Sequence, residues 1–336
     1  MANGTKNNGN MINKIYHIAD VHIRNVKRHK EYREVFKRLY SYIKKTKTDE
    51  DVIYVAGDIV HAKTDMSPEL IDITSEFFTN LADILPTIVI LGNHDCNLNN
   101  NFRLDALSPI VRAINHKNIH YLKDNGIYKV QGVHFNVMGV DEKPINYINA
   151  SDFEGDYKIA LHHGSVHNAS TDAGFTLSNT HVTTDMFIGH DLVLLGDIHK
   201  PQYLNDEKTI AYAGSLIQQN HGEALGHGIM VWDLETKKCD FVDIPNDYGY
   251  YTYHIENGEI LNPSDKIPLR PRLRLKVKDT DSATLKEIVA KIKSKYRVQD
   301  ISIQKINALN TTDVQNKINF GNVRDVEWQN NVITEY

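Results

Sequence analysis

Short apolar runs alternate with longer amphipathic segments along the first third of the chain. The apolar runs, which have the length expected of buried strands, are residues 14–19, 52–56 and 87–91. Between the first two, residues 31–47 carry apolar side chains at helical spacing and basic side chains on the opposite face. Ser67 before Pro68, and Ser108 before Pro109, indicate the first turns of two further helices. This alternation predicts an α/β arrangement.

Strands predominate after about residue 119. The further apolar or alternating runs are residues 127–140, 158–161, 191–195, 209–215, 228–234 and 239–244. Helices among the first strands, followed by a region that consists mostly of strands, predict two packed sheets with helices outside them. The predicted fold class is therefore α/β (α+β), a two-sheet β-sandwich flanked by helices.

A smaller unit is predicted near the end of the chain, after a boundary that contains Pro263 and Pro268. Residues 269–278 alternate strictly between apolar and basic side chains, as a strand with one buried face does. An amphipathic helix over residues 282–293 and a strand over 298–306 complete a small β-α-β cap. The predicted division is a disordered tail at 1–10, a main domain at 11–262, a capping domain at 263–308 and a C-terminal tail at 309–336.

Composition limits the class of protein only broadly. Of the 336 residues, 24% are charged and 41% are hydrophobic, as in an ordinary globular protein. No apolar run approaches the ~20 residues that span a bilayer, and the N-terminal residues lack the apolar core of a signal peptide. Two cysteines, Cys96 and Cys239, argue against a disulfide framework. We therefore expect a cytoplasmic or nuclear protein that does not enter a membrane.

The net charge of −5 does not by itself indicate nucleic-acid binding, but the charge is unevenly distributed. Ten Lys and Arg residues lie between Arg24 and Lys47, and only Glu31 and Glu34 oppose them. A local basic patch can neutralise phosphates even on an acidic protein. A solvated helix face is the alternative interpretation.

Five polar stretches come directly after predicted strands. They are Asp20-Val21-His22, Gly57-Asp58-Ile59-Val60-His61, Gly92-Asn93-His94-Asp95, His162-His163-Gly164 and Gly196-Asp197-Ile198-His199. Because α/β sheets bind ligands at the carboxyl ends of their strands, we expect these stretches to converge. Carboxylate, amide and imidazole groups together suit two divalent ions about 3.5–4 Å apart, and they favour manganese, iron or zinc over calcium. Asp58 is expected to bridge the two ions.

In this order and with long segments between them, the five stretches resemble the signature of the calcineurin-like metallophosphoesterases: D-x-H, G-D, G-N-H-D/E, H and G-H-x-H. Within that superfamily the chain resembles the SbcD-type nucleases, the catalytic subunits of the double-strand-break repair complex. The details that favour this branch are Ile59-Val60-His61 after Asp58, Leu161-His162-His163-Gly164, and Tyr212-Ala213-Gly214-Ser215 followed by Gly226-His227-Gly228. The resemblance covers roughly residues 14–245 and implies a four-layer core.

The resemblance also implies a role for each matching residue. One ion would be held by Asp20, His22, Asp58 and His199, and the other by Asp58, Asn93, His162 and Asp197. His94, oriented by Asp95, would stabilise the transition state or protonate the leaving oxygen. His61 would position the phosphate or the DNA end. We interpret His163 as a neighbour of the ligands or a substrate contact.

One position departs from the family pattern, because Asp197 stands where the family has a histidine. A carboxylate can still coordinate a metal at ~2.0–2.2 Å. It adds negative charge, which makes the site harder and less Lewis-acidic. In the alternative interpretation Asp197 hydrogen-bonds a neighbouring histidine, and the second ion would then be weakly held, so that activity would need high manganese.

The activity implied by the resemblance is that of a two-metal, Mn²⁺-dependent DNA nuclease, with Mg²⁺ as the alternative ion. It would be a 3′-to-5′ exonuclease on duplex ends and an endonuclease on single strands or hairpins, acting in double-strand-break repair or recombination. The implied partners are a second copy of the chain and an SbcC-type ATPase, for which residues 309–336 are a candidate binding segment. The predicted DNA contacts are Arg24, Lys27, Arg28, Arg270, Arg272 and Arg274. The alternatives are a small-molecule or cyclic-nucleotide phosphoesterase and a DNA-binding scaffold with weakened catalysis.

Overall fold

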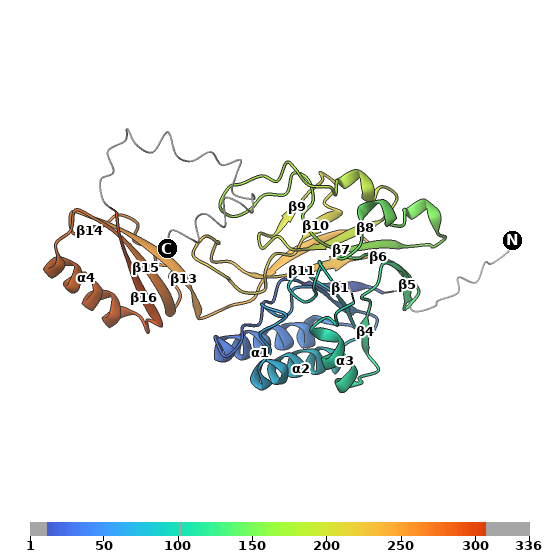
Figure 1. Ribbon diagram of the computed structural model, residues 1–336, viewed down its shortest axis with the longest axis horizontal. Coiled ribbons are helices and arrows are strands. Elements are labelled where there is room, and N and C mark those ends of the chain that lie inside the picture. Colours follow the sequence, from blue (N-terminus) through green and yellow to red (C-terminus); the bar gives the residue numbers. More distant parts are fainter. Residues whose placement is uncertain (1–11, 101, 307–336) are drawn as a thin grey trace. The chain divides into compact units, whose positions relative to one another are not determined.

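The computed structural model describes residues 12–100 and 102–306 in two units (Figure 1). The first unit contains the chain up to Tyr251 together with Lys266–Arg272, and the second contains Thr252–Asp265 and the chain from Leu273 onward. The predicted tails at 1–10 and 309–336 lie outside the described residues. The structure moves the boundary predicted at residue 263, because an unpredicted strand, β13 (Tyr248–Glu256), runs into the second unit.

The first sheet of the first unit has six strands in the order β12-β11-β1-β2-β3-β4. Their bounds are β1 Lys14–Ile18, β2 Val52–Ala56, β3 Thr87–Ile90, β4 Ile119–Tyr121, β11 Gly228–Asp233 and β12 Lys238–Asp243. Strands β1 to β4 run parallel, whereas β11 pairs antiparallel with β1. The loops that follow β1, β2 and β3 therefore leave the sheet at the same edge.

The second sheet also has six strands, in the order β5-β6-β7-β8-β10-β9. Their bounds are β5 Gly126–Val130, β6 Val133–Met138, β7 Lys158–His163, β8 Leu192–Gly196, β9 Gln202–Tyr203 and β10 Ile210–Tyr212. Strands β6, β7, β8 and β10 run parallel. The two polar stretches that end β7 and follow β8 are consequently neighbours.

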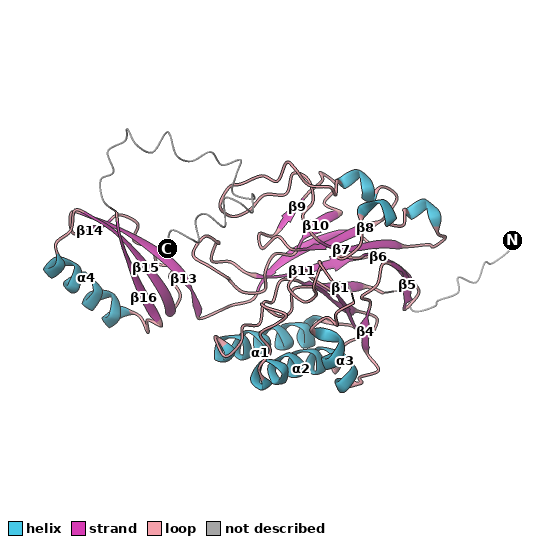
Figure 2. Ribbon diagram, in the orientation of Figure 1, coloured by secondary structure: helices cyan, strands magenta, loops and turns pink. Residues whose placement is uncertain are grey.

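Helices cover the outer face of the first sheet, and the inner faces of the two sheets pack together (Figure 2). The helices are α1 (His29–Thr46), α2 (Pro68–Ala82) and α3 (Leu107–Ile114). Their buried faces, which include Tyr32 and Phe77, share one apolar core with the first sheet. A second core between the sheets contains Tyr54, Phe135 and Trp232. Burial of these large side chains supplies the main driving force for packing the layers.

In the described part of the chain, short 3₁₀ helices and irregular segments cover the outer face of the second sheet. The 3₁₀ helices are Pro144–Asn146, Ala150–Asp152 and Thr184–Phe187. The predicted fold class, a mixed α/β fold in which sheets are flanked by helices, is confirmed. The fourth layer, however, is built from turns and irregular chain and not from long helices.

A four-stranded sheet with one helix dominates the second unit. The sheet has the order β14-β13-β15-β16, and the further bounds are β14 Glu259–Ile260, β15 Arg270–Lys278, β16 Asp300–Lys305 and α4 Ser282–Lys295. The predicted alternation is present: Leu273, Leu275 and Val277 are buried, and the basic residues between them are partly exposed. The predicted β-α-β cap corresponds to β15, α4 and β16, and β13 and β14 extend its sheet. Within the described residues, no helix has both the length and the apolar character needed to cross a membrane.

Candidate metal centre

The polar loops of both sheets meet at the carboxyl ends of their strands. In the first sheet, the backbone N–H of His22 donates to the carbonyl oxygen of Asp58 at 2.9 Å. From the second sheet, the backbone N–H of Asp197 donates to both oxygens of the Asp20 carboxylate, at 3.1 and 3.2 Å. The Nδ1–H of His163, at the end of β7, donates to the backbone carbonyl of Ala56 at the end of β2, at 2.6 Å. These bonds fix the predicted stretches of the two sheets against one another.

Two glycines allow the loops to approach so closely. A Cβ atom on Gly92 would lie 2.2 Å from both the backbone nitrogen and the Oδ1 atom of Asp58. Gly57 has φ 79°, and a Cβ atom there would lie 2.6 Å from the nitrogen of Gly92. No side chain fits at these separations. Glycine is therefore required at both positions, after β2 and after β3, for the Asp58 carboxylate to reach its place.

The ligand positions have an unusual backbone conformation. Asp20, His22 and Asp58 have φ angles of 49°, 49° and 51°, and Asp197 has φ 103°. Left-handed conformations are costly for residues other than glycine, although Asp and His tolerate them better than most. Such strain persists where the surrounding structure imposes it, which is common at functional sites.

The Asp58 carboxylate lies between two groups of imidazoles. Its Oδ2 atom is 3.5 Å from Nε2 of His22, and its Oδ1 atom is 3.4 Å from Nε2 of His163. Oδ1 also accepts the backbone N–H of His94 at 2.8 Å. One oxygen thus faces each group, which is the arrangement that a carboxylate bridging two ions requires.

Asp20, His22 and His199 form one group of candidate ligands, whose ligating atoms lie within 4.8 Å of one another. The Nε2 atoms of His22 and His199 are 3.0 Å apart. Two nitrogens bound about 2.1 Å from one ion at a right angle lie about 3 Å apart, so this separation suits neighbouring ligands of a single metal. The residues present therefore fit a divalent ion at this position.

His163, and not His162, approaches Asp58 from the second sheet. Asp20, Asp58 and His163 form another group with ligating atoms within 4.8 Å. Successive residues of a strand point to opposite faces, and His163 shares the inner face of β7 with Leu161, whose side chain lies between the sheets. His162 points to the outer face, with its ring 5.6 Å from that of Tyr147. The structure therefore adds His163 as a candidate ligand, and its interpretation as a neighbour of the ligands or a substrate contact stays a prediction.

The two remaining predicted ligands of the second ion, Asn93 and Asp197, have different hydrogen-bond partners. The amide group of Asn93 is 3.0 Å from Nε2 of His163 and 3.2 and 3.3 Å from the two oxygens of Asp58. The Asp197 carboxylate instead accepts a hydrogen bond from the Ser165 hydroxyl at 2.7 Å. Among the described residues, Asp197 belongs to none of the groups whose ligating atoms lie within 4.8 Å. Its role as a ligand stays a prediction.

Four histidines on these loops and strand ends are held by a hydrogen bond from the same ring nitrogen, Nδ1. The Nδ1–H groups of His94, His162 and His163 donate to the backbone carbonyls of His61, Met138 and Ala56, and that of His199 donates to the Glu223 carboxylate. The other ring nitrogen, Nε2, lies 3.0 Å from the Asn93 amide group in His163 and 3.0 Å from Nε2 of His22 in His199. For His162, Nε2 is buried and has no hydrogen-bond partner among the described residues. A nitrogen in this state suits the role of a metal ligand.

The electrostatics of the cluster favour positive charge between the carboxylates. Burial raises the pKa of Asp20 to about 7. Burial would lower the pKa of His199, but its hydrogen bond to Glu223 and the nearby carboxylates raise that pKa to about 9. Burial would likewise lower the pKa of His163. The charges of Asp58 and Asp20 outweigh burial and raise the pKa of His163 well above its ordinary value. A divalent cation would satisfy the same carboxylates.

Asp95 supports the backbone and does not orient the His94 ring, which corrects the predicted relation between the two. The buried Asp95 carboxylate accepts the backbone N–H groups of Ile59, Val60 and Gly92, each at 3.0 Å. The His94 ring is held instead by the carbonyl oxygen of His61 at 2.6 Å. Asp95 therefore positions the loop that carries Asp58, and His61 orients His94 through its backbone.

A cleft of about 190 Å³ opens beside the cluster and is lined by Arg24, His22, Asp58, His61 and His94, among others. The Nε atom of Arg24 is buried without a hydrogen-bond partner among the described residues. Arg24 is therefore the predicted DNA contact that the structure brings to the candidate metal ligands. Lys27 is exposed, and Arg274 lies in the second unit, so their contact with DNA stays a prediction.

Three other predicted DNA contacts are engaged in ion pairs within the first unit, and their contact with DNA stays a prediction. Arg28 donates to both oxygens of Glu31, at 2.9 and 2.8 Å, and its side chain is buried. Arg272 lies 2.8 Å from the same carboxylate, and Arg270 donates to Glu34 at 2.9 Å. The charge pattern could not reveal these partners, because tertiary packing alone brings β15 to helix α1.

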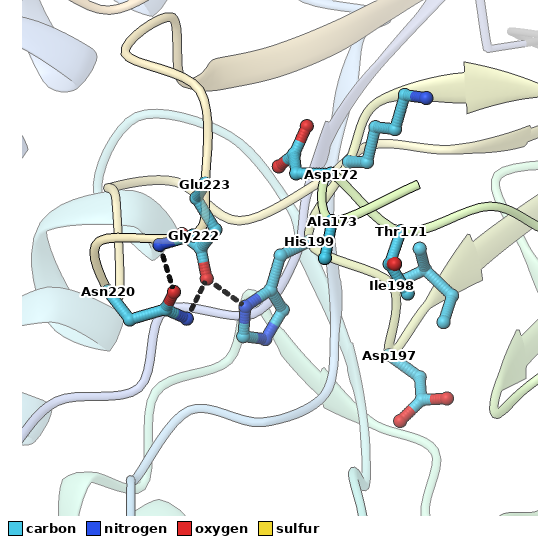
Figure 3. Close-up of a pocket in the computed structure, with 10 residues that line it drawn as sticks. Thr171, Asp172, Ala173, Asp197, Ile198, His199, Asn220, Gly222 and Glu223 are labelled. Atoms are coloured by element: carbon cyan, nitrogen blue, oxygen red, sulfur yellow. Dashed lines mark hydrogen bonds and ion pairs between the residues drawn. The ribbon is translucent and has the colours of Figure 1, made fainter. Parts of the chain in front are cut away.

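Glu223 is a residue of the site that the sequence analysis missed. Its Oε1 atom is 2.8 Å from Nδ1 of His199 and accepts a second hydrogen bond from Asn220 (Figure 3). These three residues come together at one side of a cavity of about 250 Å³, and Asp197 lies apart from them. Glu223 follows no predicted strand and matches no motif, so the sequence carried no signal for it.

The fold, with polar ligands gathered at the carboxyl ends of two packed sheets, is that of a metallophosphoesterase domain. The family model for calcineurin-like phosphoesterases matches residues 13–201, more than half of the chain, and the chain belongs to this family. Enzymes of the family use two divalent metals. The chain is also 44% identical over 301 residues to an uncharacterized protein, R555, of Acanthamoeba polyphaga mimivirus, a match that covers 86% of this chain and 22% of that protein. The chain thus spans about a fifth of the length of this relative.

Proposed function

We propose that the chain is a nuclease that hydrolyses phosphodiester bonds of DNA with the help of two divalent ions. The observation that carries the proposal is the convergence of Arg24, His61 and His94 in one cleft with the ligands His22 and Asp58. A guanidinium group binds anionic phosphate oxygens, and an imidazole can protonate a leaving oxygen. Both groups lie beside the carboxylates that would hold the metals.

The residues near Asp58 divide between two ions. Asp20, His22, Asp58 and His199 would hold the first; Asp58, Asn93, His163, His162 and Asp197 are the candidates for the second. When bound, two divalent ions polarise the phosphate and activate a water for in-line attack. Mn²⁺ suits the mixed oxygen and nitrogen donors, and Mg²⁺ is the alternative.

The chain's own groups complete the reaction. Because the carbonyl oxygen of His61 holds Nδ1–H of His94, Nε2 of His94 is the nitrogen that exchanges a proton with the leaving oxygen. The Arg24 guanidinium would bind a non-bridging phosphate oxygen by a charge-assisted hydrogen bond. His61, which lines the same cleft, would position the phosphate.

A small or cyclic-nucleotide phosphodiester is the second candidate substrate. The pairing of Arg28, Arg270 and Arg272 with Glu31 and Glu34 favours it, because these charges are unavailable to a long DNA backbone. A DNA-binding scaffold with weak catalysis is the third reading, and metal content separates it from the two enzymes.

The proposal extends to the partners of the SbcD-type nucleases, a second copy of the chain and an SbcC-type ATPase. The support for both is the resemblance in the five polar stretches. Size-exclusion chromatography with light scattering would measure self-association.

The experiment is cleavage of end-labelled duplex DNA with Mn²⁺ or Mg²⁺, set beside turnover of an aryl phosphodiester and an aryl phosphomonoester. We expect Mn²⁺-dependent cleavage, and we expect His94→Ala to slow it by about 10²–10⁴-fold, the usual contribution of a general acid. His116→Ala is the matched control, because His116 precedes β4 at the amino ends of the parallel strands and pairs with Asp83.

Turnover of an aryl phosphodiester without cleavage of DNA would replace the nuclease with the small-substrate enzyme. Absence of any turnover, in protein shown to bind fewer than two Mn²⁺ ions, would favour the scaffold. Unchanged DNA cleavage by the His94 variant would refute the assigned proton transfer.

A further inference from the structure

Glu223 belongs to a loop that is fixed from several directions. Gln218 is tied to the backbone of Tyr250 by two hydrogen bonds: its Oε1 accepts the Tyr250 N–H at 2.6 Å, and its Nε2 donates to the Tyr250 carbonyl at 3.1 Å. Nε2 also donates to the carbonyl oxygen of Glu223 at 2.9 Å. Arg28 donates to the carbonyl oxygen of Gln218 at 2.7 Å. The backbone of Glu223 is therefore held in place before any ligand binds.

The Glu223 carboxylate is itself oriented by donors of the same loop. Oε2 accepts the backbone N–H of Gln219 at 2.6 Å, and Oε1 accepts the side-chain amide of Asn220 at 2.8 Å. Only 6% of the side chain is exposed. The remaining contact of Oε1, at 2.8 Å, is Nδ1 of His199.

This contact distinguishes His199 from the three other histidines that are held through Nδ1. His94, His162 and His163 are oriented by backbone carbonyls, whereas His199 is oriented by a charged side chain. A carboxylate on Nδ1–H makes Nε2 a more basic ligand and fixes the plane of the ring. Nε2 of His199 in turn lies 3.0 Å from Nε2 of His22.

We propose that Glu223 is a positioning residue that sets the affinity of the first metal position by acting through His199. Glu223 holds the His199 imidazole in the Nδ1–H form and orients Nε2 toward His22 and Asp20. It also adds a negative charge near the ion. The inference rests on the metal-dependent activity of the family, and it does not depend on which phosphoester is cleaved.

The test is a calorimetric titration of the metal-free protein with Mn²⁺, which needs no substrate. We expect Glu223→Gln to weaken the tighter-binding ion about 10–100-fold, the range found when such partners of a ligand are removed. Glu223→Asp keeps the charge with a shorter reach, so its affinity should lie between those of the wild type and Glu223→Gln. The absorption spectrum of Co²⁺-loaded protein should change in Glu223→Gln, since it reports the ligand geometry.

Two further variants separate positioning from simple support of the loop. Glu235→Gln removes an exposed carboxylate elsewhere and should leave Mn²⁺ affinity unchanged. Gln218→Ala loosens the loop but keeps the carboxylate, and we expect a smaller loss of affinity than in Glu223→Gln. Melting temperatures confirm that each variant is folded.

Unchanged Mn²⁺ affinity in Glu223→Gln would overturn the proposal. So would an equal loss in Gln218→Ala, which would show that the loop and not the carboxylate matters. A protein that binds Mn²⁺ as expected but cleaves no DNA would contradict the proposed nuclease activity and leave this role of Glu223 standing.

Discussion

At the scale of single residues, the site depends on close approach between loops. Gly57 and Gly92 leave room for the Asp58 carboxylate, and Asp95 binds three backbone N–H groups to hold the loops in place. The left-handed backbone of Asp20 and Asp58 is part of the same arrangement. The chemistry of the ligands is therefore inseparable from the small residues beside them.

Gly92→Ala should abolish tight metal binding and destabilise the protein. The added Cβ atom would overlap the nitrogen and Oδ1 of Asp58, so the carboxylate must move. Overpacking of this kind typically costs about 1–3 kcal/mol in the free energy of unfolding. Thermal denaturation and Mn²⁺ titration measure the two effects.

The matched control for this variant is Gly226→Ala. Its Cβ atom would meet its nearest neighbour, Oδ1 of Asp243, at 3.5 Å, which is an ordinary contact. Retention of Mn²⁺ binding by Gly92→Ala would contradict the requirement for glycine at this position, because it would show that Asp58 can move without loss of metal binding.

At the scale of secondary-structure elements, charged side chains join helix α1 to Lys266–Arg272, the second segment of the first unit. Glu31 is 1% exposed and contacts both Arg28 and Arg272. The two guanidinium groups also stack on the ring of Tyr250. The basic residues that suggested a surface for DNA therefore help to fix this segment of the first unit against the helix.

Glu31→Gln should destabilise the protein by about 3–5 kcal/mol, because it leaves the buried Arg28 guanidinium and the partly exposed Arg272 guanidinium without this counter-charge. The effect should depend on pH. Burial would raise the pKa of Glu31, but Arg28 and Arg272 outweigh it and lower that pKa. A lowered pKa in the folded state means that the stabilisation is complete above the ordinary Glu pKa of about 4.3 and is lost as the pH falls below it.

Melting temperatures at pH 7 and at successively lower pH measure this dependence in the wild type and in Glu31→Gln. Glu76→Gln is the control, since Glu76 forms an exposed pair with Arg33 that should contribute at most about 1 kcal/mol. Equal melting temperatures of Glu31→Gln and wild type at pH 7 would contradict the structural role of this ion pair.

At the scale of the whole molecule, the chain has two units, each with its own buried side chains. Trp232 and Phe135 are buried between the sheets of the first unit, and Leu273, Leu275 and Val277 are buried in the second. All of the candidate metal ligands belong to the first unit. The loss of packing in the second unit should therefore leave metal binding intact.

Leu275→Ala tests this separation. Leu275 is fully buried in β15, and its truncation should cost about 2–5 kcal/mol in the stability of the second unit. Hydrogen exchange should become faster in β15 and β16 and stay unchanged in β2. Mn²⁺ affinity should equal that of the wild type, and a parallel loss of metal binding would show that the two units are coupled.

Most of the fold, and most of the candidate ligands, could be predicted from local patterns. The strands that end at Asp20, Asp58 and Asn93 are short, apolar and followed by glycine or polar residues, and a parallel sheet brings such ends together. β13 was missed because Tyr248–Glu256 mixes aromatic, small and polar residues without regular alternation. The match to the phosphoesterase family then confirmed the class of site.

The sequence by itself determined which side chains gather at the strand ends, because strand period and parallel order are local consequences of hydrophobic patterning. Only the tertiary structure decided that His163 faces Asp58 and that Glu223 orients His199. The same holds for the ion pairs of Glu31 with Arg28 and Arg272. Each of these contacts joins segments far apart in the chain. Their geometry follows from the packing of one sheet on the other and of α1 on its neighbours, which no local pattern encodes.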